Sequence, residues 1–312
     1  MNYMLLLFLG MVMMGTILGV VSSNWLVLWV GMEMALFGFM FFLYILSSLS
    51  VANAAVRYFL IQSFASILLL PTGYYFFHSF MPIHFIMEVL LLLLLFLKLG
   101  AFPFHFWVMP VVYGVLMIFN SILLGPLKII PLIVCFTLIQ KSFNDVLYSV
   151  FILLSMGSML AGSLLGNLVG NYRAVIGASS ITHTGWLLIG CMVMSVWQYF
   201  FCYYILLLFF IWAMNTGNFF ISSLSFIALS GLPPFLLFYA KVIMIWGVVS
   251  YHLFYLLLIV MVLSSIISLL FYLKFAFMFY LNMKLLRELS LQFFLFIIFN
   301  MMGLVLFLSL FF

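Results

Sequence analysis

Long apolar runs, separated by short polar or turn stretches, make up almost the whole chain. A helix that crosses a lipid bilayer needs about 20 apolar residues, whereas a transmembrane β-barrel shows short segments of alternating polarity. The pattern therefore predicts an all-α polytopic membrane protein with about eleven transmembrane helices. They are expected at residues 3–21, 24–46, 54–77, 85–107, 113–137, 145–165, 173–195, 197–217, 222–249, 251–280 and 290–311.

Two of these segments are predicted to be broken helices. Segment 115–136 has glycine and proline near 125–131, and segment 225–246 has them near 231–234. Proline removes a backbone donor and clashes with the preceding turn, and a membrane tolerates such a break where it is buried in protein or lines a wet cavity. Paired broken helices are typical of transporters built from inverted repeats, with an ion pathway between the repeats. A plain proline kink remains the alternative.

The composition excludes a soluble protein. The 312 residues are 70% hydrophobic and 4% charged, with a mean hydropathy of +1.48, whereas soluble domains carry about 25% charged residues. Because the connections between the predicted helices are short, we expect a single transmembrane domain over residues 1–312. The net charge of +5 comes from scattered basic residues, which argues against nucleic-acid binding and leaves membrane lipids as the expected surroundings.

No motif for a cofactor is recognisable in the sequence. Cys135, Cys191 and Cys202 lie in apolar segments without the CxxC spacing of zinc or iron–sulfur sites, and we interpret them as small buried residues. The glycines of GNLVGN, 166–171, follow no predicted strand and precede no lysine, so they do not indicate a nucleotide-binding loop. We therefore expect neither a cofactor nor a metal in this chain.

Basic residues in the connections predict the orientation, because loops rich in lysine and arginine stay on the cytoplasmic or matrix side. Arg57, Arg173, Lys284 and Arg287 lie in even-numbered connections, and Lys141 lies in an odd-numbered one. The N-terminus shares the side of the even connections and is predicted to face the cytoplasm or matrix. Its opening segment, MNYMLLLFLGMVMM, lacks the basic residues of a secretory signal or transit peptide.

Four charged residues fall near the middle of predicted spans: Glu33, Lys98, Lys128 and Lys241. Each costs about 2.5–3.5 kcal/mol on insertion scales, and intramembrane ionisable groups usually serve transport. Lys128 and Lys241 each follow a helix break, where water and free carbonyl groups lower the cost of a cation. We predict that these four residues transfer protons or cations. A static buried ion pair that fixes helix packing is the alternative.

A histidine, His183, lies mid-span in SSITHTGW, 179–186, among serine and threonine hydroxyls. Imidazole exchanges protons near neutral pH, and we predict a proton relay that uses water held by these hydroxyls. Helix packing through small polar residues is the alternative. Glu88, His105 and Lys274 lie near ends of predicted spans, and we interpret them as structural or interfacial.

Six stretches carry a family resemblance, and they occur in family order. They are SSNWLVLWVGMEM (22–34), RYFLIQSFASILLL (57–70), KLGAFPFHFW (98–107), SSITHTGW (179–186), LSGLPPFLLFYAK (229–241) and LLFYLK (269–274). Through them the chain resembles the subunit 2 family of mitochondrial NADH:ubiquinone oxidoreductase, respiratory complex I. The resemblance implies an antiporter-like, proton-pumping subunit of the mitochondrial inner membrane.

The resemblance also implies partners and site residues. NADH, FMN, iron–sulfur clusters and ubiquinone are expected in partner subunits, whose redox chemistry drives the pump, and neighbouring antiporter-like subunits are expected to contact this chain. The functional glutamate of the family falls on Glu33 and its central lysine on Lys98. The lysines of the two broken helices fall on Lys128 and Lys241, and the histidine of the SSITHTGW motif falls on His183.

The chain departs from the family pattern at three positions. Pro110 stands where a glutamate is frequent, Ala174 where a basic residue is frequent, and Leu237 where a glycine is usual. Any role of that glutamate is therefore missing here. Two other functions remain open at this point: a free-standing cation/proton antiporter, and a structural membrane subunit whose buried charges only fix packing.

Overall fold

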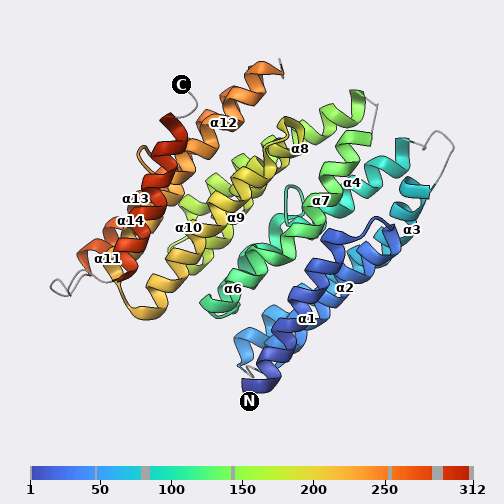
Figure 1. Cartoon of the computed structure of the whole chain (residues 1–312), viewed down its shortest axis with the longest axis horizontal. Coiled ribbons are helices and arrows are strands. Elements are labelled where there is room, and N and C mark those ends of the chain that lie inside the picture. The colour runs from blue at the N-terminus through green and yellow to red at the C-terminus, as the bar shows by residue number, and fades with distance from the viewer. Residues whose placement is uncertain are drawn as a thin grey trace. The chain divides into compact units, whose positions relative to one another are not determined.

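The computed structural model describes residues 2–45, 48–78, 85–141, 145–251, 255–282 and 291–308, and every regular element within them is a helix (Figure 1). The elements are α1 (Asn2–Val21), α2 (Trp25–Tyr44), α3 (Leu49–His78), α4 (Phe85–Leu99), the 3-10 helix η1 (His105–Trp107), α5 (Val108–Gly114), α6 (Met117–Leu124), α7 (Pro126–Lys141), α8 (Asp145–Leu168), α9 (Tyr172–Val193), α10 (Val196–Thr216), α11 (Phe219–Ser230), α12 (Leu236–Ser250), α13 (Tyr255–Leu281) and α14 (Leu291–Leu308). The predicted all-α class is confirmed.

Eight helical segments in the described part of the chain are long and apolar enough to cross a membrane. They are α1, α2, α3, the α6–α7 pair, α8, α9, α10 and α13. Many of their large apolar side chains are exposed, which suits helices that face lipid or another membrane subunit. The predicted spans at 85–107, 222–249 and 290–311 contain shorter helices, namely α4, the α11–α12 pair and α14.

Contacts between helices divide the chain into two compact units, Met1–Ser158 and Met159–Phe312. In the first unit, α4 packs against α3 and α7, and α2 packs against α1, α3 and α7. In the second unit, α9 packs against α10, α12 and α13. In the 18-residue apolar stretch of each helix, 94% of α9 is buried, compared with 22% of α1. Helix α9 is therefore an interior helix, and its polar residues are shielded from the surroundings.

Both predicted helix breaks are present. Gly125, with φ −110° and ψ −96°, separates α6 from α7, and α7 begins at Pro126, a first-turn position that proline favours. Gly231 caps α11 with φ +74°, in the left-handed region that favours glycine. Pro131, in contrast, stays inside α7, so the first break is shorter than the predicted 125–131.

A third break lies inside the span predicted at 85–107. Helix α4 ends at Leu99, and Gly100 turns the chain with φ +69°. The turn residues that follow, such as Ala101 and Phe102, are apolar, so hydropathy does not reveal the turn. As a correction to the prediction, Lys98 lies in the last turn of α4 and not in mid-helix.

Candidate functional site

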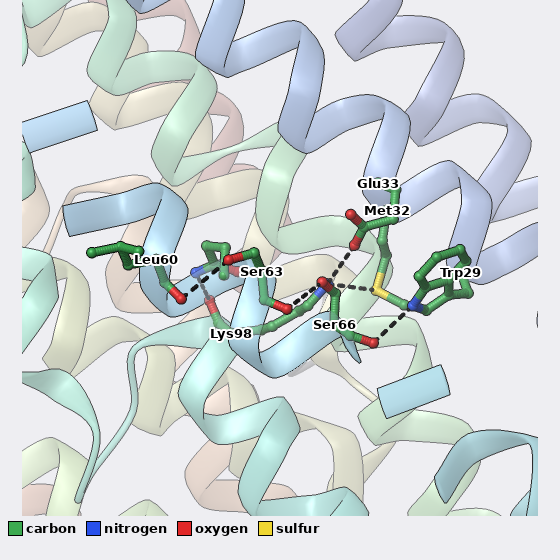
Figure 2. A network of polar contacts seen from close by, with 8 residues as sticks. Trp29, Met32, Glu33, Leu60, Ser63, Ser66 and Lys98 are labelled. Atoms are coloured by element: carbon green, nitrogen blue, oxygen red, sulfur yellow. Dashed lines mark hydrogen bonds and ion pairs between the residues drawn. The ribbon is translucent and has the colours of Figure 1, made fainter. Parts of the chain in front are cut away.

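Glu33 and Lys98 form a buried ion pair in the first unit (Figure 2). Glu33 comes from α2 and Lys98 from the end of α4, and 3.8 Å separates Glu33 Oε1 from Lys98 Nζ. The side chains are 16% and 4% exposed, respectively, so water screens their attraction weakly. This carboxylate oxygen has no hydrogen-bond partner among the described residues, and the lysine charge is its main source of stabilisation.

Side chains from two other elements hold the end of α4 that carries Lys98. Gln62 of α3 donates from Nε2 to the Lys98 carbonyl at 3.1 Å, and Trp107 of η1 donates from Nε1 to the Leu97 carbonyl at 3.0 Å. The last carbonyl groups of a helix have no intrahelical partner, and these two donors satisfy them in a buried place. They also fix the position from which the Lys98 side chain extends.

Hydrogen bonds between α2 and α3 fix the face that carries Glu33. Trp29, one turn before Glu33, donates from Nε1 to the Ser66 carbonyl at 2.9 Å. The Ser66 hydroxyl in turn donates to the Ser63 carbonyl at 2.9 Å. Figure 2 shows this series of contacts running along α3 beside the ion pair. Because a buried indole N–H needs a partner, the bond to Ser66 holds α2 in the register that brings Glu33 to Lys98.

Two small cavities adjoin the ion pair. Each has a volume of about 20 Å³, which is room for about one water molecule. One cavity is lined by both Lys98 and Lys128, and both cavities are lined by Tyr58 and Gln62. Amine, phenol and amide groups together supply the polar partners that a buried water requires. The cavities therefore provide a site for water between Lys98 and Lys128.

Lys128 is buried in the first turn of α7. Its backbone N–H donates to the Gly125 carbonyl at 2.9 Å, across the break that the sequence predicted. The N-terminal end of a helix carries partial positive charge, which disfavours a cation there, and burial adds to the cost. This position does not stabilise the helix, which favours a functional interpretation of the lysine.

Lys241 lies at the other predicted break, in the second unit. Its ammonium donates to the carbonyl of Ser230, the last residue of α11, at 2.7 Å, and lies 5.4 Å from the centroid of the Trp186 ring. A helix C-terminus and an aromatic face both stabilise a cation. A Cβ atom on Gly231 would lie 2.9 Å from Lys241 Cδ, so the glycine makes room for the lysine stem.

His183 lies at the centre of a tyrosine cluster in the second unit. Its Nδ1 is 2.8 Å from the Tyr199 hydroxyl of α10, and its Nε2 is 3.0 Å from the Tyr272 hydroxyl of α13. The Tyr203 ring packs on the imidazole with 4.4 Å between centroids. Trp186, one turn along α9, stacks parallel to Tyr199 at 5.9 Å. His183 and Lys241 thus both lie beside Trp186.

The hydroxyl groups that flank His183 in the sequence serve their own helix. Ser179, Ser180, Thr182 and Thr184 each donate to the backbone carbonyl three residues earlier, at 2.6–2.8 Å, a common arrangement for these residues in helices. The prediction expected the relay partners of His183 in its own segment. The imidazole itself bonds side chains from α10 and α13, and the Ser179 hydroxyl of its own segment also interacts with the Tyr272 hydroxyl.

The predicted site residues therefore fall into two groups, with Glu33, Lys98 and Lys128 in the first unit and Lys241 and His183 in the second. Sequence reading missed further candidates, which are Tyr58, Gln62, Tyr199 and Tyr272. An amide in an apolar run, as at Gln62, is a usable signal. Tyr199 and Tyr272 give no such signal, because their pairing with His183 depends on how α10 and α13 pack against α9.

Broken helices and buried charges are typical of ion transporters with discontinuous membrane helices. Residues 22–227 match the transmembrane family described as NADH:quinone oxidoreductase/Mrp antiporter. The fold is similar to a chain of the Mrp complex from Dietzia sp. DQ12-45-1b, with a TM-score of 0.75 and 16% identity over 85% of this chain and 58% of that one. A chain of Thermus thermophilus respiratory complex I with bound aureothin gives a TM-score of 0.81 and 16% identity over 97% of this chain and 78% of that one.

Curated relatives narrow the family further. NADH-ubiquinone oxidoreductase chain 2 of Albinaria caerulea is 36% identical over 88% of this chain and 89% of its own length. The corresponding chains of Anopheles gambiae and Lumbricus terrestris are each 32% identical, over 86% and 84% of this chain and 83% and 82% of their own lengths. The chain therefore belongs to the NADH:quinone oxidoreductase/Mrp antiporter family and, within it, to the NADH-ubiquinone oxidoreductase chain 2 family, which confirms the motif resemblance.

Proposed function

We propose that the chain is a proton-pumping subunit in the membrane arm of NADH:ubiquinone oxidoreductase, driven by redox chemistry in other subunits. The observation that carries the proposal is the buried Glu33–Lys98 pair beside a water-sized cavity that reaches Lys128. Family membership supports it, since the relatives are chains of the same oxidoreductase. In this proposal the chain itself holds no cofactor or metal, and NADH, FMN, iron–sulfur clusters and ubiquinone bind to other subunits.

Glu33 controls the charge of Lys98 in this mechanism. When the carboxylate lies close to the ammonium, their attraction stabilises the protonated lysine. When the two separate, burial destabilises the ammonium, and Lys98 releases its proton. The cavity lined by Lys98 and Lys128 is the proposed acceptor route, because it has room for about one water molecule and both lysines line it. Separation of a buried ion pair is therefore the step that drives the proton onward.

Helix ends give the three lysines different environments. Lys98 is in the last turn of α4, and Lys241 bonds the last carbonyl of α11, so helix dipoles stabilise both cations. Lys128 is in the first turn of α7, where the dipole has the opposite effect. A proton is held less strongly at Lys128 and is passed on. We propose Lys241 as its destination, with His183 as a further carrier.

The proposed setting is the mitochondrial inner membrane, where the chain contacts other membrane-arm subunits, including antiporter-like neighbours, and lipids, and binds no nucleic acid. We propose that the N-terminus faces the matrix. The support for this orientation is the placement of Arg173 in the first turn of α9. Arg57, which the prediction places in a connection, lies inside α3 and adds no support. Lys284 and Arg287, which enter the same argument, lie outside the described residues.

The test uses the intact complex of a genetically tractable homologue. Glu33→Gln and Lys98→Ala are expected to remove this subunit's share of the protons pumped per NADH oxidised, because each removes a group of the proposed proton route. Lys274→Gln is the matched control, because Lys274 is exposed on α13 and is expected to be dispensable. If both site variants pump as well as the control, the proposed mechanism is wrong.

The two other functions make different predictions. Similarity to the Mrp complex fold favours the free-standing antiporter as the second candidate. In native electrophoresis of mildly solubilised membranes, that antiporter would migrate apart from NADH-oxidising activity, whereas a subunit of the oxidoreductase migrates with it. For a purely structural subunit, Lys128→Gln and Lys241→Met would reduce assembly while pumping per assembled complex stays unchanged.

A further inference from the structure

The tyrosine cluster around His183 contains two residues to which the motifs assign no role. We infer that Tyr199 and Tyr272 carry protons into and out of His183, so that the three residues form one proton wire through α10, α9 and α13. This inference rests on the proposed function, because a proton wire has a use only if the chain moves protons.

The contacts around the imidazole support a wire. The Tyr199 hydroxyl lies 2.8 Å from Nδ1, and the Tyr272 hydroxyl lies 3.0 Å from Nε2, both within hydrogen-bond range. Relative exposure is 2% for His183, 0% for Tyr199 and 1% for Tyr272. Bulk water does not reach the imidazole, so a proton arrives through hydrogen-bonded neighbours. A hydroxyl on each nitrogen supplies both an entry and an exit.

One proton can pass through the three residues without leaving a charge behind. In the starting tautomer the Tyr199 hydroxyl donates to Nδ1, and the Nε2–H group donates to the Tyr272 oxygen. A proton that binds the Tyr199 oxygen releases the hydroxyl proton, which forms a bond to Nδ1. The Nε2–H bond breaks, its proton binds the Tyr272 oxygen, and the original Tyr272 hydroxyl proton leaves.

The transfer also creates a gate. After one passage His183 carries its proton on Nδ1, and Nδ1–H now donates to the Tyr199 oxygen. This nitrogen accepts no further proton from Tyr199 until the first tautomer is restored, since a neutral imidazole has a single acceptor nitrogen. The wire therefore passes one proton for each reset of the tautomer.

Tyr203 provides a matched control inside the same cluster. It lies one turn from Tyr199 on α10, it is 1% exposed, and its ring packs on His183. Its hydroxyl, however, has no hydrogen-bond partner in the part of the chain that the structure describes. Tyr203→Phe removes the same atom as Tyr199→Phe, but it leaves both hydrogen bonds of the imidazole in place.

The experiment compares Tyr199→Phe, Tyr272→Phe and Tyr203→Phe in the intact complex of a tractable homologue. Assembly is measured by native electrophoresis, and pumping is measured as protons moved per NADH oxidised by the assembled complex. The first two variants are expected to remove this subunit's share of that ratio, whereas Tyr203→Phe keeps it. A lower amount of complex with an unchanged ratio in Tyr199→Phe and Tyr272→Phe would show a structural role and overturn the wire.

The same series separates this inference from the proposed function. If Glu33→Gln and Lys98→Ala stop pumping while all three tyrosine variants pump normally, the pump stands and the wire is wrong. If Glu33→Gln and Lys98→Ala pump normally, the proposed function fails and the wire fails with it. Should neither phenylalanine variant assemble, 3-fluorotyrosine at position 199 keeps the shape and makes the hydroxyl a stronger acid. The wire then requires a changed pumping rate, and an unchanged rate overturns it.

Discussion

Gly231 meets two demands at the same position. Its backbone adopts φ +74°, and a Cβ atom there would lie within 3.0 Å of Lys241 Cδ, Cε and Nζ. Gly231→Ala is expected to cost about 1–2 kcal/mol for the left-handed backbone. It is also expected to displace the Lys241 ammonium from the Ser230 carbonyl. Proton pumping per assembled complex should therefore fall, which reconstituted complex in proteoliposomes would reveal.

Gly217 is a control that separates the cost of the left-handed backbone from the displacement of Lys241. It has φ +71°, but no atom lies within 4 Å of the Cβ that alanine would add. Gly217→Ala therefore carries the same backbone cost without touching a lysine. We expect it to lower stability while preserving pumping per assembled complex. Equal pumping by Gly231→Ala and Gly217→Ala would mean that the position of Lys241 does not depend on Gly231.

At this residue scale the sequence identifies the charges but not what surrounds them. Glu33, Lys98, Lys128 and Lys241 are conspicuous because charge is rare in long apolar runs. The groups that contact these charged side chains are common in any sequence, so nothing in the sequence distinguishes them. A backbone carbonyl such as that of Ser230, and a tyrosine such as Tyr199, become site groups only when neighbouring helices pack together. A single sequence contains no direct record of those contacts.

At the scale of elements, the C-terminal end of α4 is held in place by hydrogen bonds from neighbouring elements, and the bond from Gln62 can be tested. Gln62 of α3 donates to the buried Lys98 carbonyl, and loss of that donor leaves the carbonyl unpaired at a cost of about 1–3 kcal/mol. Gln62→Leu is expected to lower the thermal stability of the assembled complex. It should also lower pumping, because the residue lines both water-sized cavities.

The neighbouring Ser63 provides the comparison for Gln62. Its hydroxyl donates to the Leu60 carbonyl of its own helix at 3.2 Å, so Ser63→Ala removes no contact between α3 and α4. Such a substitution is expected to stay within about 0.5 kcal/mol of the unmodified protein. Thermal denaturation of the two variants, followed by loss of NADH-driven pumping, tests the assignment. Gln62→Leu as stable as Ser63→Ala would contradict it.

Helix positions were predictable to the extent that turns contain polar or conformationally special residues. The breaks at Gly125 and Gly231 were visible because proline and glycine occur together there. The turn after Leu99 was not, because apolar residues surround Gly100 and hydropathy continues across the turn. The start of α3 was placed too late for a related reason. Helix α3 begins at Leu49, and its first residues include the polar Ser50 and Asn53, which hydropathy assigns to a connection.

For the whole molecule, the proposed pathway draws on both compact units. The first contributes Glu33, Lys98 and Lys128, and the second contributes Lys241 and His183. Residues on one pathway act in series, because a proton that is blocked at the first step never meets the second. Residues on independent pathways would instead lower pumping separately. The combination of two variants therefore distinguishes one route from two.

A double variant makes this argument measurable. Lys98→Ala and Lys241→Ala are each expected to lower the protons pumped per NADH oxidised, and residues that act as a unit are strongly non-additive. On a single route the double variant should pump about as poorly as the worse single variant, and adding Lys274→Gln to either should change nothing further. Separate routes would make the two losses add, because the fluxes through parallel routes sum. A double variant that loses the sum of both single losses would therefore show that the two units conduct protons independently.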